Sequence, residues 1–314
     1  MLSEEYGMQP APGYGKLLPN APNLHPSDFE MWFFLFWAGA LVVVIALPWA
    51  FMQYRKGNHM PALCLAGGLA CSIQEPMWDH LGHLRWAEAL PDAFSNFGLD
   101  VPVLIPPCYM LFFGLEVFFI FTMLNRGITR KDLALLFVAC GITDAIMEHP
   151  GLLMGIYEYY GNGGPQPFDF GNKFPFYWSI VNSAGFMAGG VMCHYLWPKL
   201  KGKGWKELII IAIPPVGMMV GYSFTAWPVF LAINANISVE LQWILGGGGC
   251  VIGAIGFVYL VAELVCVEES DVEWTLWNLF KARFMLPAQR ERFYESGGKT
   301  TKRQPKVVAS TTTK

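Results

Sequence analysis

Two stretches of the chain carry the same pattern of acids and a histidine. Ala70–Gly82 reads ACSIQEPMWDHLG, and Ala139–Gly151, 69 positions further on, reads ACGITDAIMEHPG. Each stretch contains an acid, a second acid four positions later and a histidine directly after it. The six residues are Glu75, Asp79 and His80 in the first stretch and Asp144, Glu148 and His149 in the second. Because residues i and i+4 share one face of a helix, each stretch would project both carboxyl groups to the same side.

These acids end long apolar runs, where ionisable side chains are costly and therefore mark functional sites. A carboxylic acid removed from water has its pKa raised and can stay protonated at neutral pH. Such an acid can protonate a hydrophobic substrate, and a second carboxylate, or a carboxylate–histidine pair, can take up a proton at the end. We therefore predict acid–base catalysis that uses no cofactor and no metal, with Glu75 and Asp144 as the deeper pair of acids.

The composition indicates a membrane protein. The chain is 54% hydrophobic and only 14% charged, whereas soluble domains carry roughly 25% charged residues. The formal net charge is −3, and the basic residues lie in separate connecting segments. This pattern argues against a nucleic-acid partner.

Seven apolar segments have about the length that spans a bilayer. They cover approximately residues 29–54, 60–80, 101–124, 132–155, 174–197, 207–232 and 240–267. We predict an all-α, polytopic membrane protein with an internal repeat that relates helices 2–3 to helices 4–5. The predicted divisions are an extramembrane N-terminal arm (1–28), a seven-helix transmembrane domain (29–267), an interfacial amphipathic helix (268–286) and a basic disordered tail (287–314).

The basic residues predict the orientation. All lysines and arginines except Lys16, Arg85 and Lys173 fall in the loops after helices 1, 3 and 5 or in the C-terminal region. By the positive-inside rule, the N-terminus lies outside and the C-terminus in the cytoplasm. The chain is thus expected to be a multi-pass protein of the plasma membrane in a prokaryote, or of the endoplasmic reticulum in a eukaryote.

In this topology both acid–acid–histidine stretches lie towards the outer ends of helices 2 and 4. We predict that Glu75 and Asp144 face one cavity, which opens sideways or outward and is closed on the cytoplasmic side. Further aromatic and polar residues are candidates for substrate binding. They are Trp78, Tyr109, Tyr157, Tyr177, Trp178, Asn182 and Glu240. Aromatic faces in such a cavity would stabilise a carbocation by cation–π attraction.

Met60-Pro61-Ala62-Leu63, which opens helix 2, and Glu75 further along it resemble the seven-helix integral-membrane terpene cyclases of fungal meroterpenoid pathways. The resemblance implies that Glu75 protonates the epoxide or alkene of an isoprenoid chain. The family's glutamate typically follows a tryptophan, whereas Gln74 precedes Glu75 here. Its second acid comes from a late helix, where this chain has Glu240 and Glu263, besides Asp144 from the repeated stretch.

The segment Glu148–Tyr160, EHPGLLMGIYEYY, resembles the membrane carotenoid hydratases, which also protonate a terminal isoprene unit. Both resemblances imply an isomerase or lyase whose partner is a hydrophobic isoprenoid or lipid small molecule in the bilayer.

Two other classes of function remain open on the sequence. The carboxylates and imidazoles of the two stretches could hold a metal in a lipid hydrolase or oxygenase-like enzyme, although the acid-to-histidine spacing differs from the E-x-x-H of di-iron helices. Alternatively, an internal repeat with acids inside the membrane suits a proton-coupled carrier or a lipid-binding protein.

Overall fold

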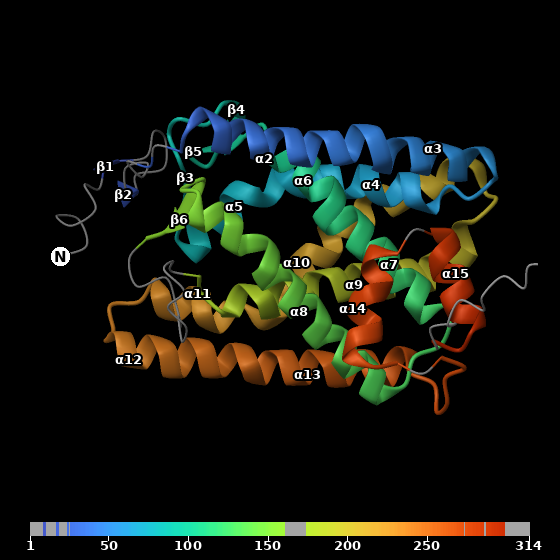
Figure 1. Ribbon diagram of the computed structural model, residues 1–314. Helices are drawn as coiled ribbons and strands as arrows, with labels where there is room; N and C mark the ends of the chain where they lie inside the picture. Colours follow the sequence, from blue (N-terminus) through green and yellow to red (C-terminus); the bar gives the residue numbers. More distant parts are fainter. Residues whose placement is uncertain are drawn as a thin grey trace, which may run out of the picture.

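The computed structural model describes residues 9–10, 17–18, 24, 26–160, 174–272, 274–285 and 287–298. Most of the predicted N-terminal arm, the segment 161–173 and the end of the predicted tail from 299 onward lie outside these residues. The described part is mostly helical, as predicted, and its long helices run along one common direction (Figure 1).

Between residues 28 and 265 the described chain forms seven helical stretches, of which five change helix type along their length. In chain order they are α2–η1–α3 (Asp28–Ala40, Leu41–Ala46, Leu47–Arg55), α4–η2–α5 (Met60–Cys71, Ser72–Gln74, Glu75–Gly82), α6–η3–α7 (Ile105–Tyr109, Met110–Leu115, Glu116–Leu124), α8 (Arg130–Leu153), α9 (Tyr177–Leu200), η4–α10–α11 (Gly204–Ala212, Ile213–Thr225, Trp227–Ile233) and α12–η5–α13 (Val239–Leu241, Gln242–Gly247, Gly248–Val265). Local sequence fixes where two of them begin: Ser27 and Glu30 form a capping box at α2, and Thr129 caps α8.

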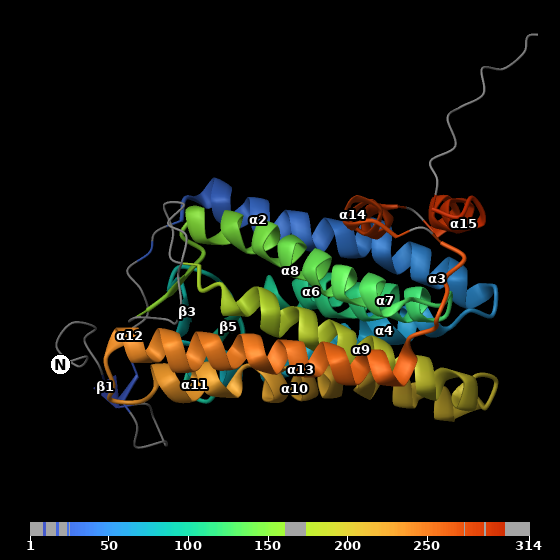
Figure 2. The same ribbon diagram turned by 90° about the horizontal axis from the view of Figure 1, so that it is seen from below.

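Five helical stretches of the described residues are long and apolar enough to cross a membrane. They are Asp28–Arg55, Ile105–Leu124, Arg130–Leu153, Gly204–Thr225 and Val239–Val265. The first and last of these stretches bury few of their residues inside the bundle. In the most apolar 18 residues of each, only 17% and 28% of the residues are buried. They run along opposite edges of the bundle (Figures 1 and 2).

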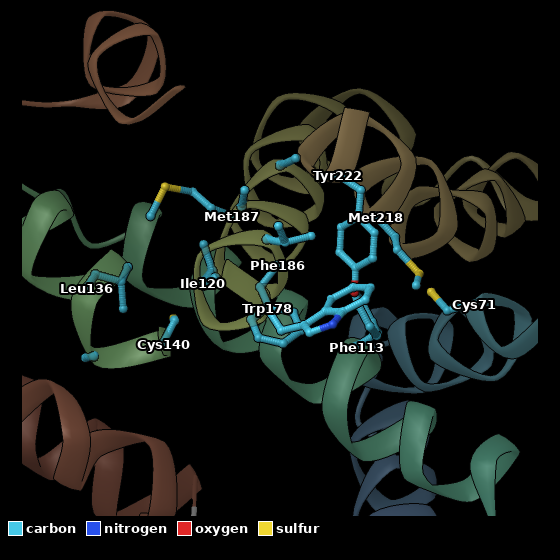
Figure 3. Close-up of a cluster of buried hydrophobic side chains, with 14 of the residues drawn as sticks. Cys71, Phe113, Ile120, Leu136, Cys140, Trp178, Phe186, Met187, Met218 and Tyr222 are labelled. Carbon is cyan, nitrogen blue, oxygen red and sulfur yellow. The ribbon is translucent and has the colours of Figure 1, made fainter. Parts of the chain in front are cut away.

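Helix α9 forms the centre of the bundle and packs against α7, α8, α10 and α13. Its approach to α10 depends on glycines, since a Cβ atom at Gly217 would lie 2.5 Å from the Cα atom of Gly189. Small residues four positions apart allow such close contact between membrane helices. Beside this contact, Phe113, Trp178, Phe186 and Tyr222 cluster in the core (Figure 3).

Short antiparallel ladders join some of the connecting segments, and the all-α prediction did not include them. β1 (Gln9–Pro10) pairs with β2 (Leu17–Leu18), and β4 (Asp92–Asn96) pairs with β5 (Leu99–Pro102). β3 (Leu84–Trp86) follows α5 and pairs with β6 (Tyr157–Tyr159), which follows α8. The β3–β6 ladder therefore ties together the ends of the two helices that carry the acid–acid–histidine stretches.

The C-terminal region forms two helices whose axes lie across the bundle, α14 (Leu276–Phe284) and α15 (Pro287–Glu295) (Figures 1 and 2). α14 falls inside the predicted interfacial segment and packs on α8. The prediction of disorder from residue 287 is wrong for α15. Phe293 and Tyr294, both 5% exposed, pack against Trp274 with ring centroids 6.1 and 5.8 Å away, and this burial offsets the polar composition of the segment.

Candidate functional site

A cavity with a volume of about 990 Å³ lies between α2–α3, α5, α6–η3–α7 and α8. Its lining is mostly apolar, and at one end it includes the carboxyl groups of Glu75, Asp79 and Glu148. Along α6–η3–α7 the wall runs from Leu104 to Phe119, which corresponds to about 22 Å at the rise of a helix. The cavity is thus long enough for an extended lipid chain.

Two irregular helical segments form facing parts of the wall. η1 contributes Leu41, Val44, Ile45 and Ala46, and η3 contributes Leu111, Phe112 and Leu115. Such widened turns break the regular hydrogen-bond pattern of a helix and often occur at functional sites. Val44 and Ile45 are 69% and 52% exposed, so the side of the cavity along α2–α3 is open. This geometry fits the predicted sideways opening.

Glu75 lies at the first residue of α5, where a single 3-10 turn interrupts the helix and Pro76 restarts it. Its side chain is 6% exposed and accepts a hydrogen bond at Oε2 from the Tyr109 hydroxyl. The preceding Gln74 turns to the other side, where its Nε2 donates to the Pro215 carbonyl oxygen at 3.1 Å. Of these two neighbouring residues, therefore, Glu75 lines the cavity and Gln74 does not.

Asp79 and Glu148 are the second acids of the two repeated stretches, and an aromatic side chain donates to each. Trp86 Nε1 donates to Asp79 Oδ2 at 3.0 Å, and the Tyr157 hydroxyl donates to Glu148 Oε2. Trp86 and Tyr157 are opposite partners in the β3–β6 ladder, with ring centroids 4.9 Å apart. The ladder thus brings the two acids to the same end of the cavity as Glu75.

Asp144 is fully buried but does not line this cavity. It lies on the side of α8 that packs against α9, where Asn182 Nδ2 donates to Asp144 Oδ1 at 2.8 Å. The Tyr222 hydroxyl donates to Asn182 Oδ1, and both Asn182 and Tyr222 line the cavity. The prediction that Asp144 faces the same cavity as Glu75 is therefore wrong. Asn182 separates it from the cavity, and Glu148 lines the wall instead.

Aromatic rings surround the carboxyl end of the cavity. Trp78 lies edge-on to Tyr222 with ring centroids 4.7 Å apart, and Tyr159 lies 6.2 Å from Trp178. All four residues line the cavity, and rings within about 6 Å of a cation stabilise it. Of the predicted binding residues, Trp78, Tyr109, Tyr157, Trp178 and Asn182 lie here.

The structure places the other predicted site residues elsewhere. His80 and His149 do not line the cavity, and His149 Nδ1 lies 2.6 Å from the Ala145 carbonyl oxygen of its own helix. Tyr177 lines a separate cavity of about 200 Å³, and its hydroxyl donates to the Gly82 carbonyl oxygen at 3.2 Å. Glu240 is exposed at the start of the last long helix, because it follows the capping Ser238 at a loop. The prediction of one shared pocket is wrong for these residues.

The cavity also extends beyond the outer half in which it was predicted, and its far end is formed by Glu116, Arg283 and Arg290. Arg283 reaches from α14 into the bundle and pairs with Glu116 at 2.6 Å, with its side chain only 3% exposed. These two arginines, Trp86 and Tyr222 were not predicted as site residues. The sequence offers a hint only for Trp86, which follows the first repeated stretch closely. The others come from distant segments.

Among the described residues, no group of three or more His, Cys, Asp or Glu side chains is arranged to hold a metal ion. Glu75, Asp79 and Glu148 share the cavity, but each is engaged by a tyrosine or tryptophan donor. The arrangement can therefore donate and accept protons next to an apolar chain. No protein-family model, curated protein or solved structure matches this chain.

Proposed function

We propose that this chain is a membrane enzyme that protonates an isoprenoid or other prenyl lipid and so starts a cyclisation, hydration or isomerisation. The observation that carries the proposal is the position of Glu75, a buried carboxyl group at the end of a long apolar cavity lined by aromatic rings. A general acid must lie within hydrogen-bond reach of the atom that it protonates, and a chain filling this cavity would end at Glu75.

The proposal includes the topology that the sequence predicts. The stretches 60–82 and 177–200 would join the five apolar helices as membrane spans, with the N-terminus outside and the C-terminus in the cytoplasm. The internal repeat is supported by one shared feature of the two halves: Asp79 accepts from Trp86, and Glu148 accepts from Tyr157, each donor lying on the strand that follows the helix.

The reaction begins when the Glu75 proton adds to one carbon of a substrate double bond. The π electrons form the new C–H bond, and the neighbouring carbon becomes a cation beside Trp78, Trp178 and Tyr222. The Tyr109 hydroxyl, which already donates to Glu75 Oε2, stabilises the carboxylate that remains.

The reaction ends with the loss of a proton to Asp79 or Glu148. In a cyclisation or isomerisation, a C–H bond next to the cation breaks and its electrons form a new double bond. In a hydration, water bonds to the cation and then loses its proton. Asn182 and Tyr222 lie on the wall near this point and would orient the chain, with Asp144 holding Asn182 as a positioning residue.

The experiment that tests the class of reaction is incubation of the purified protein with prenyl alcohols, prenyl epoxides and carotenoid-like polyenes in D₂O. Enzymatic protonation predicts a product that carries one carbon-bound deuterium, measured by mass spectrometry. A product formed without deuterium incorporation at carbon, from every alkene substrate that reacts, would reject the proposal.

A second candidate function is a lipid carrier or lipid-binding protein, and the open side of the cavity along α2–α3 favours it. This function predicts that prenyl lipids bind in the cavity and are recovered unchanged from the same D₂O incubation. Transfer of a fluorescent prenyl lipid between two populations of vesicles, at a rate that depends on the protein, would then identify the carrier.

A further inference from the structure

The end of the cavity opposite Glu75 contains a second group of charged residues that the proposed reaction does not use. Glu116 comes from the first turn of α7, Arg283 from α14 and Arg290 from α15. All three line the cavity. Glu75 contacts Tyr109 and Arg290 lies against Phe119, ten residues or about 15 Å further along the same helical stretch. A ligand that reaches both ends must therefore be apolar along most of its length and polar at both ends.

Arg283 and Glu116 neutralise each other. Arg283 Nη2 lies 2.6 Å from Glu116 Oε1, and Arg283 Nη1 also donates to the Ala139 carbonyl oxygen at 2.9 Å. A buried arginine and a carboxylate in direct contact leave no net charge for a ligand to neutralise. This pair therefore forms a fixed polar wall.

Arg290 supplies a charge that no direct ion pair with a described residue neutralises, although the charges of Glu116 and Glu291 also act on it. Its Nε donates to the Ala282 carbonyl oxygen at 3.0 Å and its Nη2 to the Met285 carbonyl oxygen at 3.5 Å, and its guanidinium lies 4.9 Å from the centre of the Phe119 ring. Among the described residues, no carboxylate lies within ion-pair distance of it. Burial lowers the pKa of Arg290, yet a guanidinium stays charged at neutral pH.

We propose that Arg290 binds the phosphate group of an amphiphile whose apolar chain lies along the cavity. Arginine presents planar, paired N–H donors that match phosphate oxygens, and a buried cation without a direct ion pair is stabilised by such an anion. That this amphiphile is the isoprenoid substrate, bound as a prenyl phosphate with its far end at Glu75, rests on the proposed function. The phosphate site itself rests only on the geometry of Arg290.

The test compares two probes that share one chain, farnesyl phosphate and farnesol. Binding to the protein in phosphatidylcholine nanodiscs is measured by the change in tryptophan fluorescence, because Trp49, Trp78 and Trp178 line the cavity. The variants are Arg290→Gln, which removes the charge, and Arg290→Lys, which keeps it. Arg292→Gln is the matched control, since Arg292 lies on the same helix but is exposed and does not line the cavity.

A charge-assisted hydrogen bond to phosphate predicts that the wild type and Arg292→Gln bind farnesyl phosphate roughly 10- to 100-fold more tightly than farnesol. Arg290→Gln should lose this preference while still binding farnesol, and Arg290→Lys should keep part of it. Equal affinity of the wild type for both probes would overturn the proposal, as would an undiminished preference in Arg290→Gln. If Arg290→Gln does not fold, the proposal is tested with the wild type and Arg290→Lys alone. Equal affinity of Arg290→Lys for farnesyl phosphate and farnesol would then count against the proposal.

Two further experiments complete the test. The first distinguishes a membrane phospholipid from a prenyl phosphate as the ligand, and the second distinguishes failure of the phosphate site from failure of the proposed catalytic function. Phosphatidic acid that displaces bound farnesyl phosphate with a lower dissociation constant than that of farnesyl phosphate would assign the site to a membrane phospholipid. Weaker competition would assign it to a prenyl phosphate. Glu75→Gln should keep the preference for phosphate even though it stops turnover. Equal affinity of the wild type for farnesyl phosphate and farnesol, together with Glu75-dependent turnover, would reject only the phosphate site.

Discussion

Trp86 and Tyr157 face each other across the β3–β6 ladder, and each donates a hydrogen bond to the second acid of one repeated stretch. Their ring centroids lie 4.9 Å apart. The ladder thereby couples the C-terminal ends of α5 and α8, so that Asp79 and Glu148 reach the same cavity as Glu75.

Replacing either donor tests this coupling. Trp86→Phe and Tyr157→Phe keep the aromatic ring but leave Asp79 or Glu148 without its donor, which should lower the free energy of unfolding by about 1–3 kcal/mol each. The double variant should lose less than the sum of the two single variants, because the rings are in contact. Thermal unfolding in detergent, followed by circular dichroism, measures the three losses. Strict additivity would show that the ladder does not couple the two acids.

The Arg283–Glu116 pair attaches α14 to the bundle. Arg283→Met should destabilise the protein by roughly 3–5 kcal/mol, because it leaves Glu116 buried without its partner. Arg283→Met combined with Glu116→Leu should recover most of this loss. Hydrogen exchange at the amides of α14 reports the attachment directly and should rise in the single variant.

The exposed pair Arg130–Glu263 provides the control, with side chains 58% and 44% exposed. Arg130→Met should cost at most about 1 kcal/mol, since water screens such pairs. A similar loss for Arg130→Met and Arg283→Met would show that burial of the Arg283 pair is unimportant.

The burial of His83 predicts how the free energy of unfolding depends on pH. Burial lowers the pKa of its imidazole, whose Nε2 lies 3.1 Å from Asn234 Oδ1, while the ring stacks on Tyr160. A histidine with a lowered pKa in the folded state takes up a proton on unfolding, so its contribution is present above pH ~6.5 and is lost as the pH falls below that value.

The variant His83→Asn removes the titrating group and tolerates the positive φ of 59° at this position. Its unfolding midpoint should fall less than that of the wild type between pH 7.5 and pH 5.5. The same midpoint shift in both proteins would contradict a role for His83.

Local sequence predicts the long helices of this protein well, because long apolar runs and capping residues act over a few positions. α8 was predicted at 132–155 and is observed at Arg130–Leu153, and α9 was predicted at 174–197 and is observed at Tyr177–Leu200. Glu75 lines the cavity, as predicted, but its place in the repeated stretch does not explain this, because Asp144 at the equivalent place does not line it.

The choice between Asp144 and Glu148 could not be predicted in the same way. Both lie on similar faces of α8, and only the packing of α9, which places Asn182 against Asp144, decides which acid reaches the cavity. Arg283 was predicted only as part of the interfacial helix and Arg290 only as part of the basic tail. The role of Arg283 could not be predicted, because its contacts join residues 144 or more positions apart. Helix α15 likewise depends on burial against Trp274.

The central claim is that Glu75 donates the proton, and the turnover of Glu75→Gln tests it most directly. The control is Glu240→Gln, the same substitution at an exposed residue outside the cavity. With the prenyl lipid that incorporates deuterium and in buffer treated with EDTA, Glu75→Gln should lose ~10²–10⁴-fold in rate, the usual contribution of a general acid. Its affinity for that lipid should stay unchanged, and Glu240→Gln should match the wild type. Wild-type turnover in Glu75→Gln, or activity that disappears with EDTA and returns with iron or zinc, would contradict the account.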